Sequence, residues 1–593
     1  MAEYNGFTAR AVILGVLLSI VYSSVNIYLN INFGWGFSFS TLTIILSYLL
    51  FRGSDPSRKL SEMGVAMIAG SSGLTMGFTT AMLLYFRQTL HEVPIPDWLV
   101  PSTQSLAEKS LVLADWVVPM AYLFFVAASS SLIGFLFALK TSDLFLSDAR
   151  LTFPTYVAPA TLAESTLKGG EAARFAGTFA LGAAAVTLVQ YGVKIVGVSA
   201  AEIDVTPMLP EGFVFAVSLG LGFMAIGYMI STRTSLTILA TGLFTYLALT
   251  PILTSRGILA YSRDSMELYN RLLMNVTVSP VLGMLILGGF ALSLLGLLRR
   301  LISGRRRKDP ERAGYLELYR RFYSGILKDR RLLLVFLALV ISSFAITYLL
   351  NPFHPFPPYV SVLFYGYVLL IGNFVEFMII TRMQGEAGMG SGAAGIMLHE
   401  IPKFASGYQG VAGYLALQTN AQWSGSALVG YHKIAEKFRL RTGTVLKAIL
   451  VTWLPTFVAT AALVVALWKY IGFFTSTMPC ISLLQLGILY KMLATRTLAG
   501  VVEPTTFLAG ALIGTVLEVA TPLSMFGVAL GLILPPHYPI ALGIGGFVRY
   551  YTDRRFGKRW FWEKGMIAGS GVLAGSMIVQ VFMMIILRLA LNI

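Results

Sequence analysis

Two carboxylates stand inside apolar stretches of the chain. Glu376 lies in Leu369–Phe377, and Glu518 lies in Gly514–Pro522. Charge inside a bilayer is costly, so ionisable residues there are candidates for function. A carboxyl group in apolar surroundings favours its neutral form and can take up and release protons. We therefore predict Glu376 and Glu518 as proton-coupling residues. The alternatives are a structural pairing of Glu376 with an Arg or Lys of a neighbouring helix, and a packing role for Glu518.

Uncharged polar residues form the predicted substrate site. They offer hydrogen bonds and an aromatic wall without a fixed charge, which suits a zwitterionic or chelated ligand. Asn373 is on the same helical face as Glu376, and any of these residues could instead join helices to one another. The full set is Asn26, Tyr28, Asn30, Asn373, Asn420, Gln422 and Trp423.

Residue types needed for other chemistry are scarce. Cys480 is the single cysteine, so neither an internal disulfide nor a cysteine metal cluster can form. His399-Glu400 lacks the second histidine of a zinc-protease motif, and no Walker-type nucleotide loop is present. We therefore expect no catalytic residues, no metal site and no cofactor, and predict that the protein is not an enzyme.

Composition indicates a membrane protein. Hydrophobic residues make up 56% of the 593 residues and charged residues 12%, about half the charged share of a soluble domain. The apolar runs are continuous and long, which favours helices over an alternating β-barrel. The predicted fold is all-α, with roughly 14–16 transmembrane helices. Apolar spans run over 9–29, 36–51, 62–86, 112–139, 172–196, 212–231, 234–253, 275–298, 332–350, 359–381, 445–468, 480–495, 506–534 (interrupted at Thr521-Pro522), 538–551 and 565–591.

The net charge of +16 sits mainly between these spans. This distribution is typical of cytoplasmic loops and argues against nucleic-acid binding. It predicts a cytoplasmic N-terminus and a cytoplasmic basic linker, 299–331, in a multi-pass protein of the cell membrane. The linker would join two related transmembrane halves, 1–298 and 332–593. The polar, glycine-rich stretch 383–432 is predicted to form broken or re-entrant helices; a long cytoplasmic loop is the alternative.

Three motifs in order resemble the oligopeptide transporter family, which includes the yellow-stripe metal-chelate transporters. They are Asn26-Ile27-Tyr28-Leu29 with Gly34-Trp35, the loop Leu151–Pro154 with Leu167–Glu171, and the C-terminal Leu542–Arg549 with Gly565–Gly575. The chain departs from the family pattern at Asn30, Asn32, Thr161 and Ser576, and 383–432 does not align with it.

The resemblance implies a secondary active transporter. Its substrate class would be small peptides or metal chelates, carried by symport with a proton or another cation. Membrane lipids and a second copy of the chain, as a homodimer, are the further partners considered. Two other functional classes stay open at this point. One is a membrane-embedded enzyme acting on lipid-linked substrates through His399-Glu400 and Glu386, and the other is a passive channel.

Overall fold

The computed structural model describes the chain apart from residues 1–5, 34–39, 52, 54, 90–94, 149–150, 169, 196–201, 286–314, 389–398, 401, 474–477, 479, 481–482, 484–486, 488–489, 492, 496–502, 522 and 592–593. The chain forms two compact units. Unit 1 comprises Met1–Ser142, Arg321–Met378 and Gly395–Ala499, and unit 2 comprises Asp143–Arg320, Ile379–Ala394 and Gly500–Ile593. Each unit therefore draws on three separate segments. The division into related halves, 1–298 and 332–593, stays a prediction.

Unit 1 is helical. Its elements, of which α6, α14 and α17 also contribute residues to unit 2, are α1 (Ala9–Phe33), α2 (Ser40–Leu50), α3 (Pro56–Ser71), α4 (Gly77–Thr89), α5 (Thr103–Ala107), α6 (Leu113–Leu146), α14 (Tyr315–Lys328), α15 (Arg330–Leu350), α16 (Pro358–Gly366), the π-helical turn η4 (Tyr367–Gly372), α17 (Asn373–Ala387), α19 (Ala412–Leu415), α20 (Ala421–Ala435), α21 (Thr442–Ala466) and the π-helical turn η5 (Leu467–Ile471).

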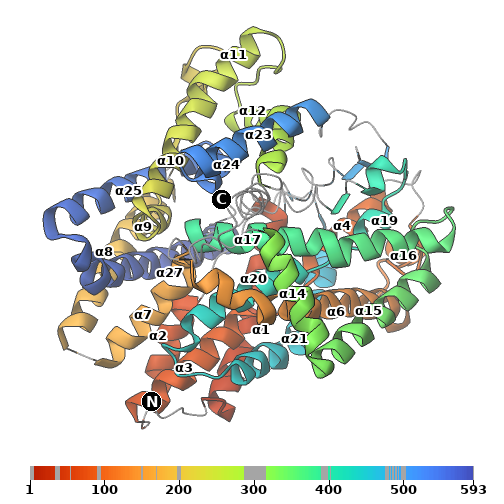
Figure 1. Ribbon diagram of the computed structural model, residues 1–593, viewed down its shortest axis with the longest axis horizontal. Coiled ribbons are helices and arrows are strands. Elements are labelled where there is room, and N and C mark those ends of the chain that lie inside the picture. Colours follow the sequence, from red (N-terminus) through yellow and green to blue (C-terminus); the bar gives the residue numbers. More distant parts are fainter. Residues whose placement is uncertain are drawn as a thin grey trace, which may run out of the picture. The chain divides into compact units, whose positions relative to one another are not determined.

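The helices α1, α3 and α21 pack against one another within unit 1 (Figure 1). Small residues allow the close approach: a Cβ added at Gly15 would lie 2.4 Å from Cβ of Ala69. A hydroxyl pair, Ser19 Oγ and Thr456 Oγ1 at 2.9 Å, joins α1 to α21. Such contacts are typical of helices in lipid, where the hydrophobic effect does not drive helices together.

Unit 2 is also mainly helical. Its elements are α7 (Pro154–Lys168), α8 (Gly170–Ile195), β1 (Glu202–Asp204), the 3₁₀ turn η1 (Thr206–Met208), β2 (Ala216–Ser218), α9 (Leu221–Met229), α10 (Thr232–Phe244), the π-helical turn η2 (Thr245–Leu249), α11 (Thr250–Ser255), α12 (Ser265–Leu272), the π-helical turn η3 (Leu273–Thr277), α23 (Pro504–Ala520), α24 (Met525–Ile533), α25 (His537–Phe556), α26 (Lys558–Trp560), the π-helical turn η6 (Phe561–Gly565) and α27 (Met566–Leu591).

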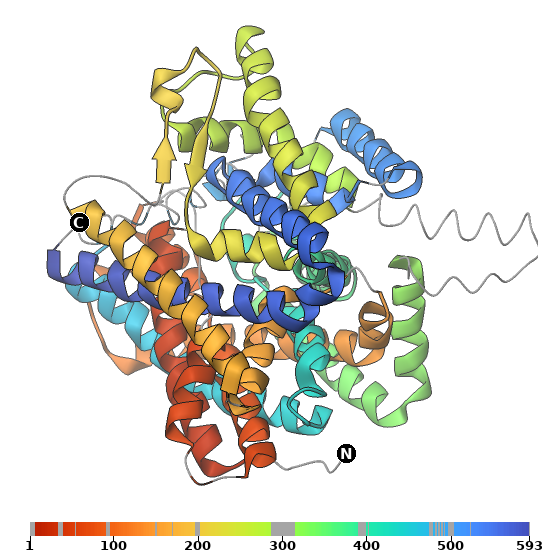
Figure 2. The ribbon, with the colours of Figure 1, turned by 90° about the vertical axis from the view of Figure 1, so that its left-hand side faces the viewer.

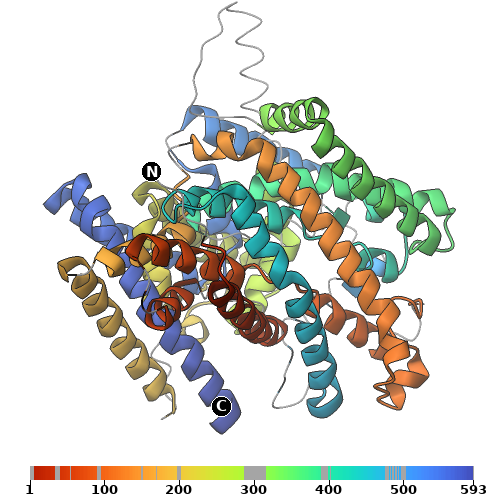
Figure 3. The ribbon, with the colours of Figure 1, turned by 90° about the horizontal axis from the view of Figure 1, so that it is seen from below.

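Two close helix pairs hold unit 2 together. The first is α8 with α27, which lie side by side in Figure 3. The second is α9 with α25, where each helix places a buried glycine against the backbone of the other. A Cβ at Gly227 would lie 2.1 Å from the carbonyl oxygen of Leu542, and one at Gly545 would lie 2.0 Å from that of Met224. Neither position has room for a side chain.

The described residues contain six helical segments long and apolar enough to cross a bilayer. This result confirms the all-α, polytopic class. The segments are Ala9–Tyr28, Leu113–Leu146, Thr232–Ser255, Arg330–Leu350, Pro358–Ala387 and Thr442–Ile471.

Three spans depart from continuous helices. The break predicted at Thr521-Pro522 is confirmed, since α23 ends at Ala520 and α24 begins at Met525. The span predicted over 62–86 is wrong as one helix, because α3 ends at Ser71 and α4 starts at Gly77. The span predicted over 212–231 is also wrong. There, β2 pairs antiparallel with β1 (yellow arrows in Figure 2) and only the short α9 follows.

The α9–α25 contact gives a stability prediction. Gly545→Ala should lower the free energy of unfolding by about 1–3 kcal/mol, because the new methyl group overpacks a backbone contact. Thermal unfolding of the purified protein measures this change. The control is Gly182→Ala in α8, where a Cβ has no neighbour within 4 Å and the helix propensity of alanine is favourable. Equal melting temperatures for the two variants would contradict the close approach of α9 and α25.

Candidate functional site

The buried carboxylate Glu376 has a histidine partner. The helix that carries Glu376 runs from Pro358 to Ala387 and contains the π-helical turn η4 just before Asn373. Such turns are frequent at functional sites. Oε2 of Glu376 lies 2.8 Å from Nε2 of His399, and both side chains are almost fully buried. The structure therefore pairs Glu376 with a second titratable group; among the described residues, no Arg or Lys forms the ion pair that was considered as its structural alternative.

Amide groups flank this pair. Asn373 is fully buried one turn before Glu376, and its Oδ1 accepts a hydrogen bond of 2.7 Å from Thr419 Oγ1. Gln422 donates from Nε2 to the carbonyl oxygen of Thr419 at 3.3 Å. Among the described residues, Nδ2 of Asn373 and Oε1 of Gln422 have no hydrogen-bond partner. A buried donor and a buried acceptor are thus left for a ligand, water or another conformation.

A buried ion pair comes from the same segment as His399. Lys403 Nζ lies 2.7 Å from Oε2 of Glu400, and the two side chains are 1% and 2% exposed. The ammonium group is also 5.5 Å from the ring centroid of Tyr414. Glu400 is close enough to Glu376 and His399 to interact with their charges. Unit 1 therefore gathers four ionisable side chains in its interior.

Unit 1 also contains a cavity of about 220 Å³. Its wall includes the non-helical stretch between α3 and α4, where backbone groups are released from helical hydrogen bonding. The remaining walls come from α6, from α20 with the residue before it, and from α21. The lining residues are Ser71, Ser72, Gly73, Leu74, Thr75, Phe135, Asn420, Trp423, Ser424, Ala427, Tyr431, Ile449 and Trp453.

Hydrogen bonds fix Asn420 in the cavity wall. Its Nδ2 donates to Ser131 Oγ at 3.2 Å and to Ser424 Oγ at 2.9 Å, and its backbone N–H donates to Ser130 Oγ at 3.0 Å. The preceding residue, Thr419, contacts Asn373. Adjacent residues of one loop therefore contact the cavity and the helix that carries Glu376.

The structure divides the predicted binding residues. Asn420 and Trp423 line the cavity, whereas Gln422 and Asn373 belong to the buried cluster around Glu376. Asn26, Tyr28 and Asn30 are half-buried in α1 and are not among the described residues that line the cavity. Position 518 is in α23 of unit 2, but the Glu518 side chain lies outside the described residues.

Sequence reasoning missed His399, Lys403 and the α3–α4 break. His399-Glu400 was weighed as a fragment of a zinc motif and as part of a candidate enzyme site, but not as a partner of Glu376, and 383–432 has no regular pattern that would place it. Ser71-Ser72-Gly73 was the available signal for the break, since such residues are weak helix formers.

Cysteine labelling tests the cavity's placement. In a Cys480→Ser background, Ser424→Cys should react with a small water-soluble thiol reagent because Ser424 lines the cavity. Ser426→Cys is the matched control on the same helix, and it should stay unmodified because Ser426 is fully buried. Mass spectrometry of the intact protein measures both. Similar labelling at the two positions would show that the cavity is misplaced.

The sequence was also compared with known proteins. A search of the curated proteins found no match. The family model described as OPT oligopeptide transporter protein matches residues 6–587, nearly the whole chain. The protein belongs to the OPT oligopeptide transporter family.

Proposed function

We propose that the protein is a secondary active transporter that couples proton movement to the symport of small peptides or metal chelates across the cell membrane. Family membership supports transport of an oligopeptide-type solute. The observation that supports proton coupling is the buried contact between Glu376 and His399.

The Glu376–His399 pair can share one proton, which can sit on either residue. A carboxylate next to an imidazolium, and a neutral carboxyl group next to a neutral imidazole, both leave the site without net charge. Adding or removing one proton gives the site a net charge, which is costly in a dry interior. Opening of the site to water on either side of the membrane lowers that cost. Proton exchange is thus linked to the opening of the site, as alternating access requires.

The cavity at the α3–α4 break is the proposed solute site. Broken helices beside polar side chains build the binding sites of many secondary transporters. Asn420 and Ser424 offer neutral hydrogen-bonding groups, and Trp423 offers an aromatic wall. The volume of about 220 Å³ is below the range of about 300–1,000 Å³ for ligand pockets. In this conformation the cavity can therefore take only one end of a peptide, and transport requires it to enlarge.

One loop provides the coupling between solute and proton. A solute that hydrogen-bonds to Asn420 can shift Thr419, the neighbouring residue. The hydroxyl group of Thr419 donates a hydrogen bond to Asn373. Asn373 is one turn from Glu376 on the same helix. Solute binding can therefore change the position of Glu376 relative to His399.

The enzyme alternative has little support in the described residues. Its best candidates were His399, Glu400 and Glu386. His399 contacts Glu376, and Glu400 contacts Lys403. Glu386 belongs to unit 2, where it accepts a hydrogen bond of 2.9 Å from Ser524. His399 and Glu400 are therefore engaged by neighbouring side chains within unit 1, and Glu386 by a serine of unit 2.

Replacing Glu376 with glutamine tests the coupling. Glu376→Gln keeps the size and hydrogen-bonding reach of the side chain but cannot titrate. In proteoliposomes it should abolish accumulation of a peptide driven by a pH gradient, while exchange of the peptide at equal pH continues. Glu436→Gln, at an exposed carboxylate of unit 1, should behave as the wild type.

Two other results would contradict the proposed proton-coupled transport. Normal uphill accumulation by Glu376→Gln would make Glu376 structural. Downhill flux alone in the wild type, with no accumulation under any ion gradient, would favour the channel alternative.

A further inference from the structure

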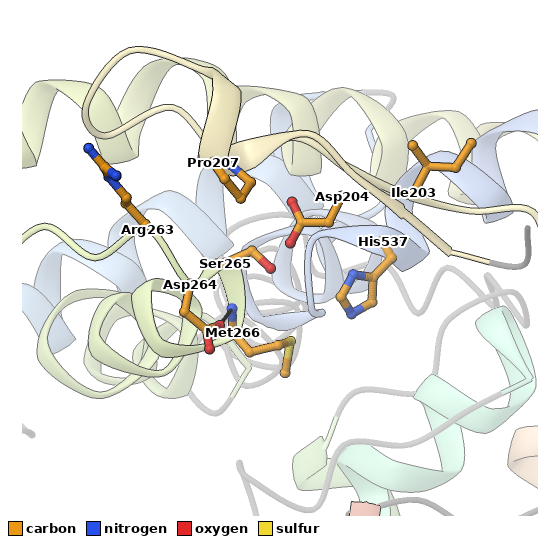
Figure 4. Close-up of a pocket in the computed structure, with 8 residues that line it drawn as sticks. All are labelled: Ile203, Asp204, Pro207, Arg263, Asp264, Ser265, Met266 and His537. Carbon is orange, nitrogen blue, oxygen red and sulfur yellow. Dashed lines mark hydrogen bonds between the residues drawn. The ribbon is translucent and has the colours of Figure 1, made fainter. Parts of the chain in front are cut away.

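Unit 2 contains a larger groove that the proposed mechanism does not use. It has a volume of about 520 Å³, within the range of sites that hold small organic ligands. Three separate segments form it: the β1–η1 strand and turn, the start of α12, and the start of α25. Figure 4 shows Asp204 from the first segment between Arg263 and His537, which lie well apart.

Backbone contacts hold the two carboxylates of the groove in place. Asp204 accepts the N–H of Thr206 at Oδ1 (2.9 Å). Asp264 caps α12, and its Oδ1 accepts the N–H groups of Met266 (2.8 Å) and Glu267 (3.2 Å). These bonds leave Oδ2 of each carboxylate without a protein partner among the described residues. Two oriented, solvent-exposed acceptors therefore line one groove.

The groove also carries a cation and apolar surface. Arg263 is exposed and has no ion-pair partner among the described residues. Ile203, Pro207 and Met266 supply the apolar part of the lining. Among the described residues, no group of three His, Cys, Asp or Glu side chains is arranged to hold a metal ion. The lining thus suits an organic ligand with both signs of charge, and not a metal.

We infer that this groove is a peripheral binding site for zwitterionic peptides, in addition to the cavity of unit 1: Asp204 and Asp264 take the amino group and Arg263 takes the carboxylate. The inference rests on the proposed transport function and favours unmodified peptides over metal chelates.

Transport by the full-length protein in proteoliposomes tests the groove, with trialanine as the probe. Asp204→Asn and Asp264→Asn remove charge but keep an oxygen for the backbone N–H groups, so the hairpin and the helix cap persist. Each should raise KM for trialanine about two- to fivefold, as expected for an exposed ion pair, with kcat unchanged. Arg263→Gln should do the same. The control is Glu211→Gln, an exposed carboxylate of the same hairpin outside the groove, which should leave KM unchanged.

Peptides blocked at one terminus show which groove residues bind the amino end and which bind the carboxyl end. The aspartate variants should not change KM for N-acetyl-trialanine, and Arg263→Gln should not change it for trialanine amide. If the groove variants match Glu211→Gln while Glu376→Gln still abolishes uphill accumulation, the groove inference fails and the proposed function stands. Equal losses for blocked and unblocked peptides would also overturn recognition of the peptide ends. If the wild type transports no trialanine, both the peptide assignment and the groove inference fail.

Discussion

A carboxylate inside an apolar helix has to find its polar partners within the protein, because the surrounding hydrocarbon offers none. Glu376 finds His399, which lies on a different segment of unit 1. That contact brings Glu400 and Lys403 into the interior, where they pair with one another. The hydrogen bond from Thr419 to Asn373 then sets the loop that leads to Asn420 and the cavity. The local structure of this polar interior thus follows from the need to pair one charge.

Two different packing regimes coexist in the chain. Glycine contacts such as Gly227 and Gly545 bring helix backbones together and leave no room for side chains, which makes these helix pairs rigid. At the breaks at 72–76 and 521–524 the helices end, so backbone groups there lack helical hydrogen bonds within otherwise apolar spans. At the first break those groups border a cavity. Rigid helix pairs with polar breaks between helical segments are what movement of a solute through a membrane protein requires.

The sequence was sufficient to predict features that depend only on a residue's neighbours along the chain. Glu376 and Asn373 stood out because a long apolar run surrounds them, and Pro522 marked the break after α23 because proline cannot continue a helix. Features that depend on distant partners could not be predicted. His399 is 23 positions from Glu376 in an irregular segment, so no periodicity links the two. Ala216–Ser218 lies in a stretch that reads as an apolar span, and only pairing with β1 makes it a strand.

The central claim is that the Glu376–His399 pair takes up or releases a proton when solute binds and the site opens to water. Infrared difference spectroscopy of the full-length protein in lipid, recorded before and after addition of trialanine, measures this directly. The account predicts a change in the carbonyl stretch of a protonated carboxyl group, and predicts that Glu376→Gln lacks it. An identical band in Glu376→Gln, or no carboxyl band in a wild-type protein that transports the peptide, would contradict the account.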